Sequence, residues 1–113
     1  MLDLERQSAL RMQCTDICRS VIRGKIGLIE GIRSLVSLSF DLGCENEQPF
    51  LGFRGIDSQS DHFPLGESRA SWNKDALARE DAKRVEFEQD FREKVVADCK
   101  EIVDRFKGAE SKG

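Results

Sequence analysis

The sequence predicts a mostly α-helical protein built on a three-helix core, in which an antiparallel helical hairpin packs against a long C-terminal helix. Apolar residues recur at steps of three and four in two segments of the first half and again in residues 73–107. Both prolines, Pro49 and Pro64, fall in the interval of residues 44–72. The 113 residues include 39% apolar and 35% charged side chains, a balance typical of long helices with solvated outer faces. A chain of this length is expected to form one helical domain over residues 1–113.

The hairpin is predicted from two apolar stripes that each end at a glycine. The first lies in residues 4–24 and stops before Gly24; its members are Leu10, Cys14, Ile17, Cys18, Val21 and Ile22. The second ends at Gly43, which is expected to cap it; its members are Leu28, Ile29, Ile32, Leu35, Val36 and Phe40. Gly27 and Gly31 lower helix propensity but let another element approach closely. A tight connection near Gly24 makes the two helices antiparallel.

Residues 44–72 are expected to form a long, largely irregular but ordered insert. The segment contains both prolines and three glycines, which interrupt helices. Residues 50–56 alternate weakly and fit either a short extended run or a packed loop. Four apolar side chains argue against disorder and are expected to fold the segment back over the helices; they are Phe50, Leu51, Phe53 and Ile56.

A helix of more than thirty residues is predicted to begin at Asn73, whose side chain caps it, with Asp75 in the first turn. Its apolar seam consists of Phe87, Phe91, Val95, Cys99, Ile102 and Phe106. Acid–base pairs at i,i+4 are expected at Asp75–Arg79, Glu80–Arg84, Glu88–Arg92, Asp90–Lys94 and Glu101–Arg105. The first half has only a weak apolar stripe, so it either projects or is covered by the middle segment or by a second chain. Residues 108–113 are expected to be a frayed tail.

Composition and charge argue against several classes of function. The net charge of −3 gives no sign of bulk nucleic-acid binding, which depends on an excess of lysine and arginine. No apolar run approaches the roughly 20 residues that span a bilayer, so no membrane association is expected. The start, MLDLERQ, lacks the basic and apolar regions of a secretory signal, and we expect a cytoplasmic protein.

The four cysteines are expected to be reduced thiols in that compartment. Cys14 and Cys18 are one helical turn apart on the first stripe, and Cys99 lies on the seam of the last helix. Buried cysteine behaves as a small apolar residue, so core packing is the favoured interpretation and no metal or cofactor is expected. The alternative is a four-thiolate zinc site that also uses Cys44, although the spacing differs from that of zinc knuckles.

The stretch GIDSQSDHFPLGESR, residues 55–69, concentrates the candidate site residues, which are Asp57, Asp61, His62, Glu67, Arg69 and the following Trp72. Two aspartates match positions of a calcium loop, but His62 and Ser68 stand where that loop needs glycine and glutamate. A metal or acid–base site is an alternative, because carboxylates can orient a histidine; it would use Asp57, Asp61, His62 and Glu67. The chain has no phosphate loop, nucleophile elbow or histidine pair, so we do not expect an enzyme.

The same stretch also has a purely structural interpretation. Aspartate and serine side chains of residues 57–61 would bond backbone amides in a turn, and His62 would donate to a backbone carbonyl. Arg69 would pair with an acidic residue. Trp72 would either pack on Leu77 as a hydrophobic staple or stand exposed as a binding anchor.

The centre of the chain resembles a group of small, uncharacterised bacterial proteins. The segments GLIEGIRSLVSL, FRGIDSQSDHFPLGESRASW and ALAREDA occur in this order within residues 24–82. They are similar to segments of that group, whose members share the patterns IDS, DH-P-G and R--W. The resemblance implies that the loop is a defined element of the fold; the matching residues are Ile56, Asp57, Ser58, Asp61, His62, Pro64, Gly66, Arg69 and Trp72. It implies no catalytic role, because no activity is established for the group.

The leading hypothesis is a non-enzymatic, cytosolic protein-binding module of the immunity or antitoxin type, which neutralises a basic partner such as a toxin. Residues 44–73 carry a net charge of −3, whereas the segments before and after them carry +1 and −1. An acidic surface can steer a basic partner. The binding residues are expected to be Asp57, Asp61, His62, Glu67, Arg69 and Trp72, with Glu45 and Glu47 adding charge. A small-molecule-binding or metal-binding protein is the alternative, and a homodimer through the long helix is a third hypothesis.

Overall fold

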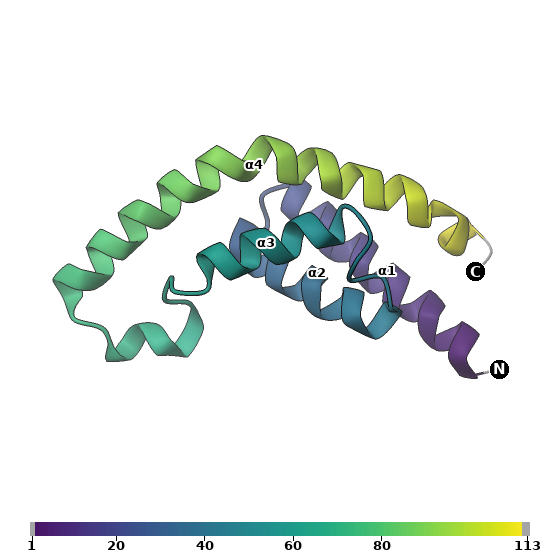
Figure 1. Cartoon of the computed structure of the whole chain (residues 1–113), viewed down its shortest axis with the longest axis horizontal. Coiled ribbons are helices and arrows are strands. Elements are labelled where there is room, and N and C mark those ends of the chain that lie inside the picture. The colour runs from purple at the N-terminus through teal and green to yellow at the C-terminus, as the bar shows by residue number, and fades with distance from the viewer. Residues whose placement is uncertain (1, 112–113) are drawn as a thin grey trace.

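The computed structural model describes the backbone of residues 2–111 and the side chains of residues 4–107. The described residues form four α-helices and one 3-10 helix, with no strand among them (Figure 1). The elements are α1 (Leu2–Ile22), α2 (Leu28–Leu42), α3 (Phe50–Ser60), η1 (Gly66–Ser71) and α4 (Lys74–Ser111). The prediction of a mostly α-helical chain is therefore confirmed.

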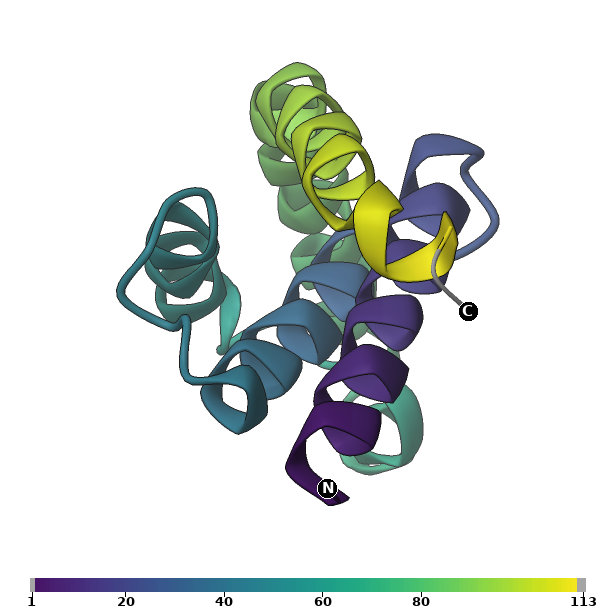
Figure 2. The same cartoon turned by 90° about the vertical axis from the view of Figure 1, so that its right-hand side faces the viewer.

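α1 and α2 form the predicted antiparallel hairpin, and the C-terminal half of α4 packs along α1 (Figures 1 and 2). α3 packs on α2 as a fourth helix beside this core. α4 arches over the hairpin, and its N-terminal half extends beyond the hairpin toward η1 (Figure 1). The result is an elongated body with extents of 51 × 27 × 24 Å.

Two glycines set the geometry of the hairpin. The connection after α1 contains Gly24, whose φ of +70° lies in the left-handed region that favours glycine. Gly31 lies where α2 meets α1, and a Cβ at this position would clash with Cγ2 of Val21. The close approach predicted for this part of the second helix is therefore confirmed.

α2 and α4 carry the predicted caps. The backbone N–H of Gly43, at a φ of +74°, donates to the carbonyl of Phe40 at 3.2 Å and closes α2. At the start of α4, Oδ1 of Asn73 accepts the backbone N–H groups of Asp75 and Ala76 at 2.9 and 3.2 Å. Both cap predictions are confirmed. They could be made from the sequence because each cap depends on a residue at the end of its own helix.

The main difference between expectation and structure is α3. Residues 50–56, for which we expected an extended run or a packed loop, belong to this helix. Its buried side chains recur at steps of three and four; they are Phe50, Phe53, Ile56 and Ser60. Gly52 and Gly55 each disfavour a helix by roughly 1 kcal/mol, but burying the two phenylalanines in the core outweighs this cost. The insert is ordered, as expected, but it contains more helix than expected.

Three of the four cysteines belong to the core. Cys14 and Cys18 of α1 and Cys99 of α4 are fully buried among apolar side chains, which confirms the packing interpretation for them. Burial raises the pKa of the Cys14 thiol to about 12, and a hydrogen bond with Cys99 together with burial raises the pKa of Cys18. Cys44 is half-buried, and all four are free thiols. Within the described residues, no group of three or more histidine, cysteine or acidic side chains is arranged to hold a metal ion.

α4 is 38 residues long and continues through Ser111. The tail that was expected to fray from residue 108 is therefore helical up to that point, and residues 112–113 lie outside the described part. No helix in the described part of the chain combines the length and the apolar character needed to cross a bilayer.

The ion pairs of α4 differ from those expected. Of the five predicted i,i+4 pairs, the described residues form Glu101–Arg105, at 3.5 Å. Arg84 contacts Glu30 of α2 and, at 3.7 Å, Glu88 of its own helix. Exposed pairs at this spacing contribute only a few tenths of a kcal/mol, so a contact to another helix readily replaces them.

Candidate functional site

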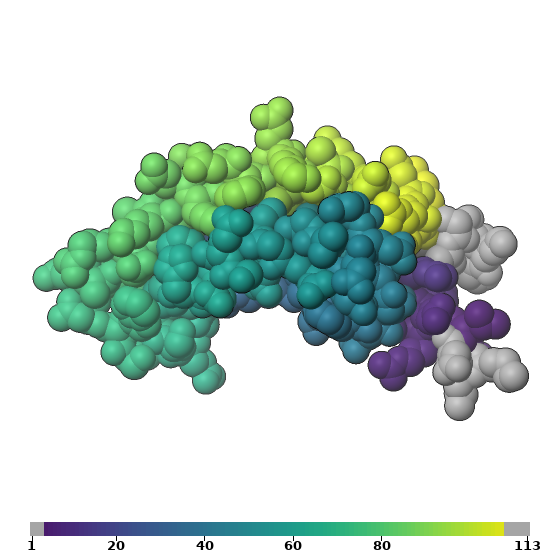
Figure 3. Space-filling view, viewed as in Figure 1, coloured from purple at the N-terminus to yellow at the C-terminus, as the bar shows by residue number. Residues whose placement is uncertain are grey.

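The six predicted binding residues lie in residues 57–72, called here the 57–72 segment. The segment runs from the last turn of α3 through η1 to the start of α4. The six are Asp57 in α3, Asp61 at its C-cap, His62 in the following turn, Glu67 and Arg69 in η1, and Trp72 at the C-cap of η1. In Figure 3 the segment and the first half of α4 appear as one continuous surface at one end of the molecule.

Asp57 is engaged within the chain. Its Oδ1 lies 3.3 Å from Nε of Arg33 on α2, and Nη2 of Arg33 donates to the carbonyl of Ser60 at 3.0 Å. One arginine thus ties the last turn of α3 to α2. The buried hydroxyl of Ser60 donates to the carbonyl of Ile56 at 2.8 Å. The turn expected over residues 57–61 is the end of a helix, and Asp57 is not a free loop carboxylate.

Arg69 fastens η1 to α4. Its Nη1 and Nη2 donate to the two carboxylate oxygens of Asp81, each at 2.8 Å, and Nη1 also donates to the carbonyl of Pro64 at 3.4 Å. A bidentate pair of this kind fixes both side chains. Its hydrogen bonds hold the pKa of the Asp81 carboxyl below its ordinary value and raise the pKa of Arg69. The expected pairing of Arg69 with an acidic residue is confirmed, and Asp81 is its partner.

Phe63 anchors the segment to the first half of α4. Its side chain is buried, and its ring centroid lies 5.7 Å from that of Phe87 in an edge-to-face arrangement. Phe87 in turn contacts Phe91 at 4.8 Å. The middle segment therefore covers part of this half of α4, while Val85 on the same half remains 53% exposed. Sequence reasoning missed Phe63, although a lone aromatic inside a polar stretch was a usable signal.

A homodimer through the first half of α4 stays a prediction.

Four of the six residues remain exposed: Asp61, His62, Glu67 and Trp72. Within the described residues, the side chains of Asp61, His62 and Glu67 form no hydrogen bond or ion pair. The ring of His62 lies 4.1 Å from that of Phe63, and the expected bond to a backbone carbonyl is not found there. Trp72 is 37% exposed, and its packing on Leu77 stays a prediction.

The structure divides the predicted acidic loop into two places. Glu45 and Glu47 precede α3, whereas Asp61 and Glu67 follow it. The 11 residues of α3, at about 1.5 Å each, form a helix about 16 Å long between the two pairs in the chain. The predicted acidic residues therefore do not lie in one continuous loop, because a helix interrupts the segment. The alternative metal site on Asp57, Asp61, His62 and Glu67 also lacks support, because no such metal-holding group occurs within the described residues.

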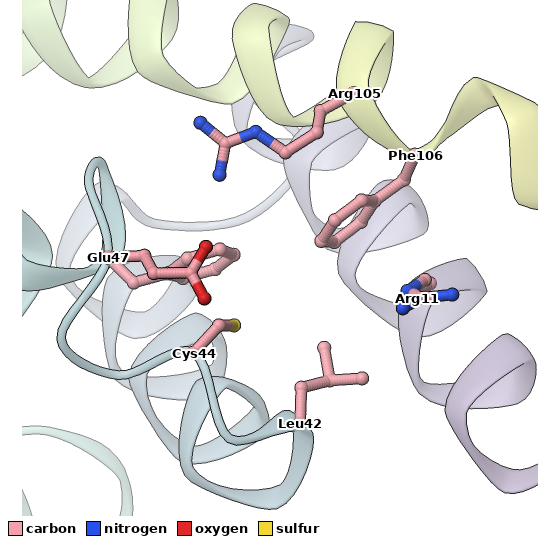
Figure 4. Close-up of a pocket in the computed structure, with 7 residues that line it drawn as sticks. Arg11, Leu42, Cys44, Glu47, Arg105 and Phe106 are labelled. Carbon is pink, nitrogen blue, oxygen red and sulfur yellow. The ribbon is translucent and has the colours of Figure 1, made fainter.

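A second candidate site lies at the other end of α3, in a cavity of about 310 Å³ (Figure 4). We call it the two-arginine pocket, and its lining residues are Arg11, Leu42, Cys44, Glu47, Phe50, Arg105 and Phe106. They come from α1, the end of α2 and the connection after it, the first turn of α3, and α4. No sequence pattern could have revealed this site, because its members are spread from residue 11 to residue 106.

Comparison with known proteins leaves the function to be inferred from these two sites. No family model matches the chain, and neither the curated proteins nor the solved structures give a match. The resemblance of residues 24–82 to small bacterial proteins therefore stays a prediction.

Proposed function

We propose that this protein is a non-enzymatic binding module that contacts a basic partner protein through the exposed face of the 57–72 segment. The carrying observation is that structural and exposed residues alternate along this segment. Asp57, Phe63 and Arg69 contact other helices and fix the backbone, whereas the four exposed side chains do not. A surface that is ordered before binding loses less conformational entropy when the partner arrives.

The exposed residues have the chemistry that such an interface needs. Asp61 and Glu67 are carboxylates without a partner in the described part of the chain, so they can steer and pair with lysine or arginine. Trp72 supplies a large apolar surface of the kind common among interface hot spots. A cytoplasmic immunity protein that neutralises a basic toxin is the class of binding protein that these features fit, by analogy of size and charge.

The test is capture of the partner from a lysate of the source cell with the tagged chain, identified by mass spectrometry. The double variant Asp61→Lys/Glu67→Lys is compared with Glu86→Lys/Glu93→Lys, which makes the same change of charge at two exposed positions of α4. We expect the wild type and the control to bind one stoichiometric basic partner. The segment variant should bind the same partner at least roughly tenfold more weakly.

Circular dichroism and thermal melting show whether each variant is folded. A folded segment variant that keeps its full affinity would remove this surface from the interface. Equal loss in both variants would mean that net charge, and not the 57–72 segment, determines binding.

A further inference from the structure

The two-arginine pocket brings side chains of both charges together over an apolar floor. The guanidinium of Arg11 lies over the ring of Phe106, 5.9 Å from its centroid. Arg105 extends from α4 toward the cavity, and Glu47 extends toward it from the connection between α2 and α3 (Figure 4). The ion pair of Arg105 is a long contact of 3.5 Å to Glu101. Glu47 has no side-chain hydrogen bond or ion pair within the described residues. Glu47 is thus unpaired, and Arg105 makes only one long contact, so both keep hydrogen-bonding capacity for a ligand.

The walls of the pocket are fixed by contacts within the chain. The backbone N–H of Glu47 donates to the carbonyl of Cys44 at 3.0 Å, and its carbonyl accepts the N–H of Leu51 at 2.9 Å. Phe50 is fully buried and stacks on Phe106 with ring centroids 6.4 Å apart. This aromatic contact joins the first turn of α3 to α4, so the two charged walls are held in place without a direct ion pair between them.

Cys44 lines the pocket beside Glu47 (Figure 4), and the pKa of its thiol is raised. Burial raises the pKa of its thiol, the carboxylates of Glu47 and Glu45 raise it further, and Arg105 lowers it. A thiol in this state is a poor nucleophile, so Cys44 serves as part of the pocket wall. The charges of Glu47 and Arg105 therefore act on the same small volume.

The geometry points to a binding site for a small zwitterion of the α-amino acid type with an apolar side chain. Its carboxylate binds Arg105, its ammonium group binds Glu47, and its side chain covers the apolar floor. A simple anion of the same shape is repelled by the glutamate, and a simple cation is repelled by both arginines. The cavity, at about 310 Å³, is at the small end of ligand pockets and suits one such molecule.

The first experiment titrates the intact chain with L-phenylalanine, 3-phenylpropionate and 2-phenylethylamine, using NMR chemical shifts and calorimetry. The second and third probes keep the phenyl group but lack the ammonium or the carboxylate. We expect L-phenylalanine to bind at least roughly tenfold more tightly than either one. Its binding should shift the amides of Cys44, Glu47, Arg105 and Phe106. Equal affinities, shifts confined to other residues, or no shifts would overturn the proposal.

Arg105→Gln and Glu47→Gln are expected to change the affinity for 3-phenylpropionate in opposite directions. Arg105→Gln is expected to lower the affinity for both L-phenylalanine and 3-phenylpropionate roughly tenfold, because the carboxylate of each probe loses a contact. Glu47→Gln is expected to weaken the binding of L-phenylalanine, because the ammonium group loses its contact. The same change is expected to strengthen the binding of 3-phenylpropionate, because it removes the repulsion of the carboxylate. A general loss of fold cannot produce this reversal. If Glu47→Gln lowers the affinity for both L-phenylalanine and 3-phenylpropionate, Glu47 is not the partner of the ammonium group and the proposal is refuted.

The matched control is Arg92→Gln, which removes an exposed arginine of α4 outside the pocket. It is expected to leave all three affinities unchanged. If Arg92→Gln weakens binding as much as Arg105→Gln does, the probes respond to net charge and the pocket is not their site.

Discussion

The two halves of α4 are held in the molecule by different kinds of contact. In the C-terminal half, four side chains are buried in the core: Val95, Cys99, Ile102 and Phe106. In the N-terminal half, none of residues 74–94 is buried. Contacts to other segments hold this half, and they are the pairs Arg69–Asp81, Phe63–Phe87 and Glu30–Arg84.

This difference shows that the first half of α4 and the 57–72 segment depend on each other. Most helical stability in proteins comes from packing of an apolar face, and this half has little such face of its own. The segment supplies Phe63 and Arg69, and α4 supplies their partners. The proposed protein-binding surface therefore belongs to this mutually dependent unit, whereas the two-arginine pocket is built on the core half.

The largest effect is expected from a cavity in the core half. Ile102→Ala removes a fully buried side chain and is expected to lower the free energy of unfolding by about 2–5 kcal/mol. Val85→Ala, at a position 53% exposed in the other half, should change it by less than about 0.5 kcal/mol. Urea denaturation measures both. Similar losses in the two variants would mean that burial does not distinguish the halves.

A smaller and more local effect is expected from Phe63→Ala, which removes the aromatic anchor of the segment. We expect the free energy of unfolding to fall by about 2 kcal/mol, because the partner Phe87 is only half-buried and the site can partly collapse. Hydrogen exchange should show lost protection in residues 74–91 and retained protection in residues 95–106. Gln59→Ala, at an exposed position of α3, should leave both the stability and the exchange pattern unchanged. A uniform loss along α4 would contradict the division into two units.

Features set by neighbouring residues could be predicted from the sequence. The cap at Asn73, the stop at Gly43 and the close approach at Gly31 each depend on a residue type within or beside its own helix. The seam of the C-terminal helix was predictable for the same reason, because its apolar steps are regular along one segment.

Features that depend on pairing between distant segments could not be predicted. α3 forms against the preference of its glycines because its phenylalanines are buried in the core formed with the other helices. Asp57 is engaged by Arg33, 24 residues away, and nothing in the local sequence distinguishes it from the free Asp61. The order of the middle segment could therefore be predicted, but the separation of its structural residues from its exposed ones required the structure.

The next prediction concerns the start of the N-terminal half. Asn73→Ala removes the acceptor for two backbone N–H groups and is expected to lower the free energy of unfolding by about 1 kcal/mol. Asn73→Asp keeps a side-chain oxygen at the same place and should retain most of the stability. Chemical denaturation of the three proteins measures the difference. Equal losses in both variants would show that capping is not the cause.

The smallest effect is expected at the partly exposed Arg69–Asp81 pair, where it appears as a dependence on pH. Because Arg69 holds the pKa of the Asp81 carboxyl below its ordinary value, the pair stabilises the folded state when the carboxyl is ionised. This contribution is fully present above the ordinary aspartate pKa of about 4 and is lost as the pH falls through the lower, folded-state pKa. Asp81→Asn removes the titrating group.

We therefore expect Asp81→Asn to be less stable than the wild type near neutral pH, with a difference that shrinks as the pH falls below about 4. Urea denaturation over this range measures it, and Glu86→Gln, which changes an exposed glutamate of the same helix, is the control. Arg69→Gln should show the same trend, and the double variant should add little, since each change breaks the same pair. A difference that stays constant into acid would mean that the pair does not form in solution. The mutually dependent unit would then rest on Phe63 and its contact with α4.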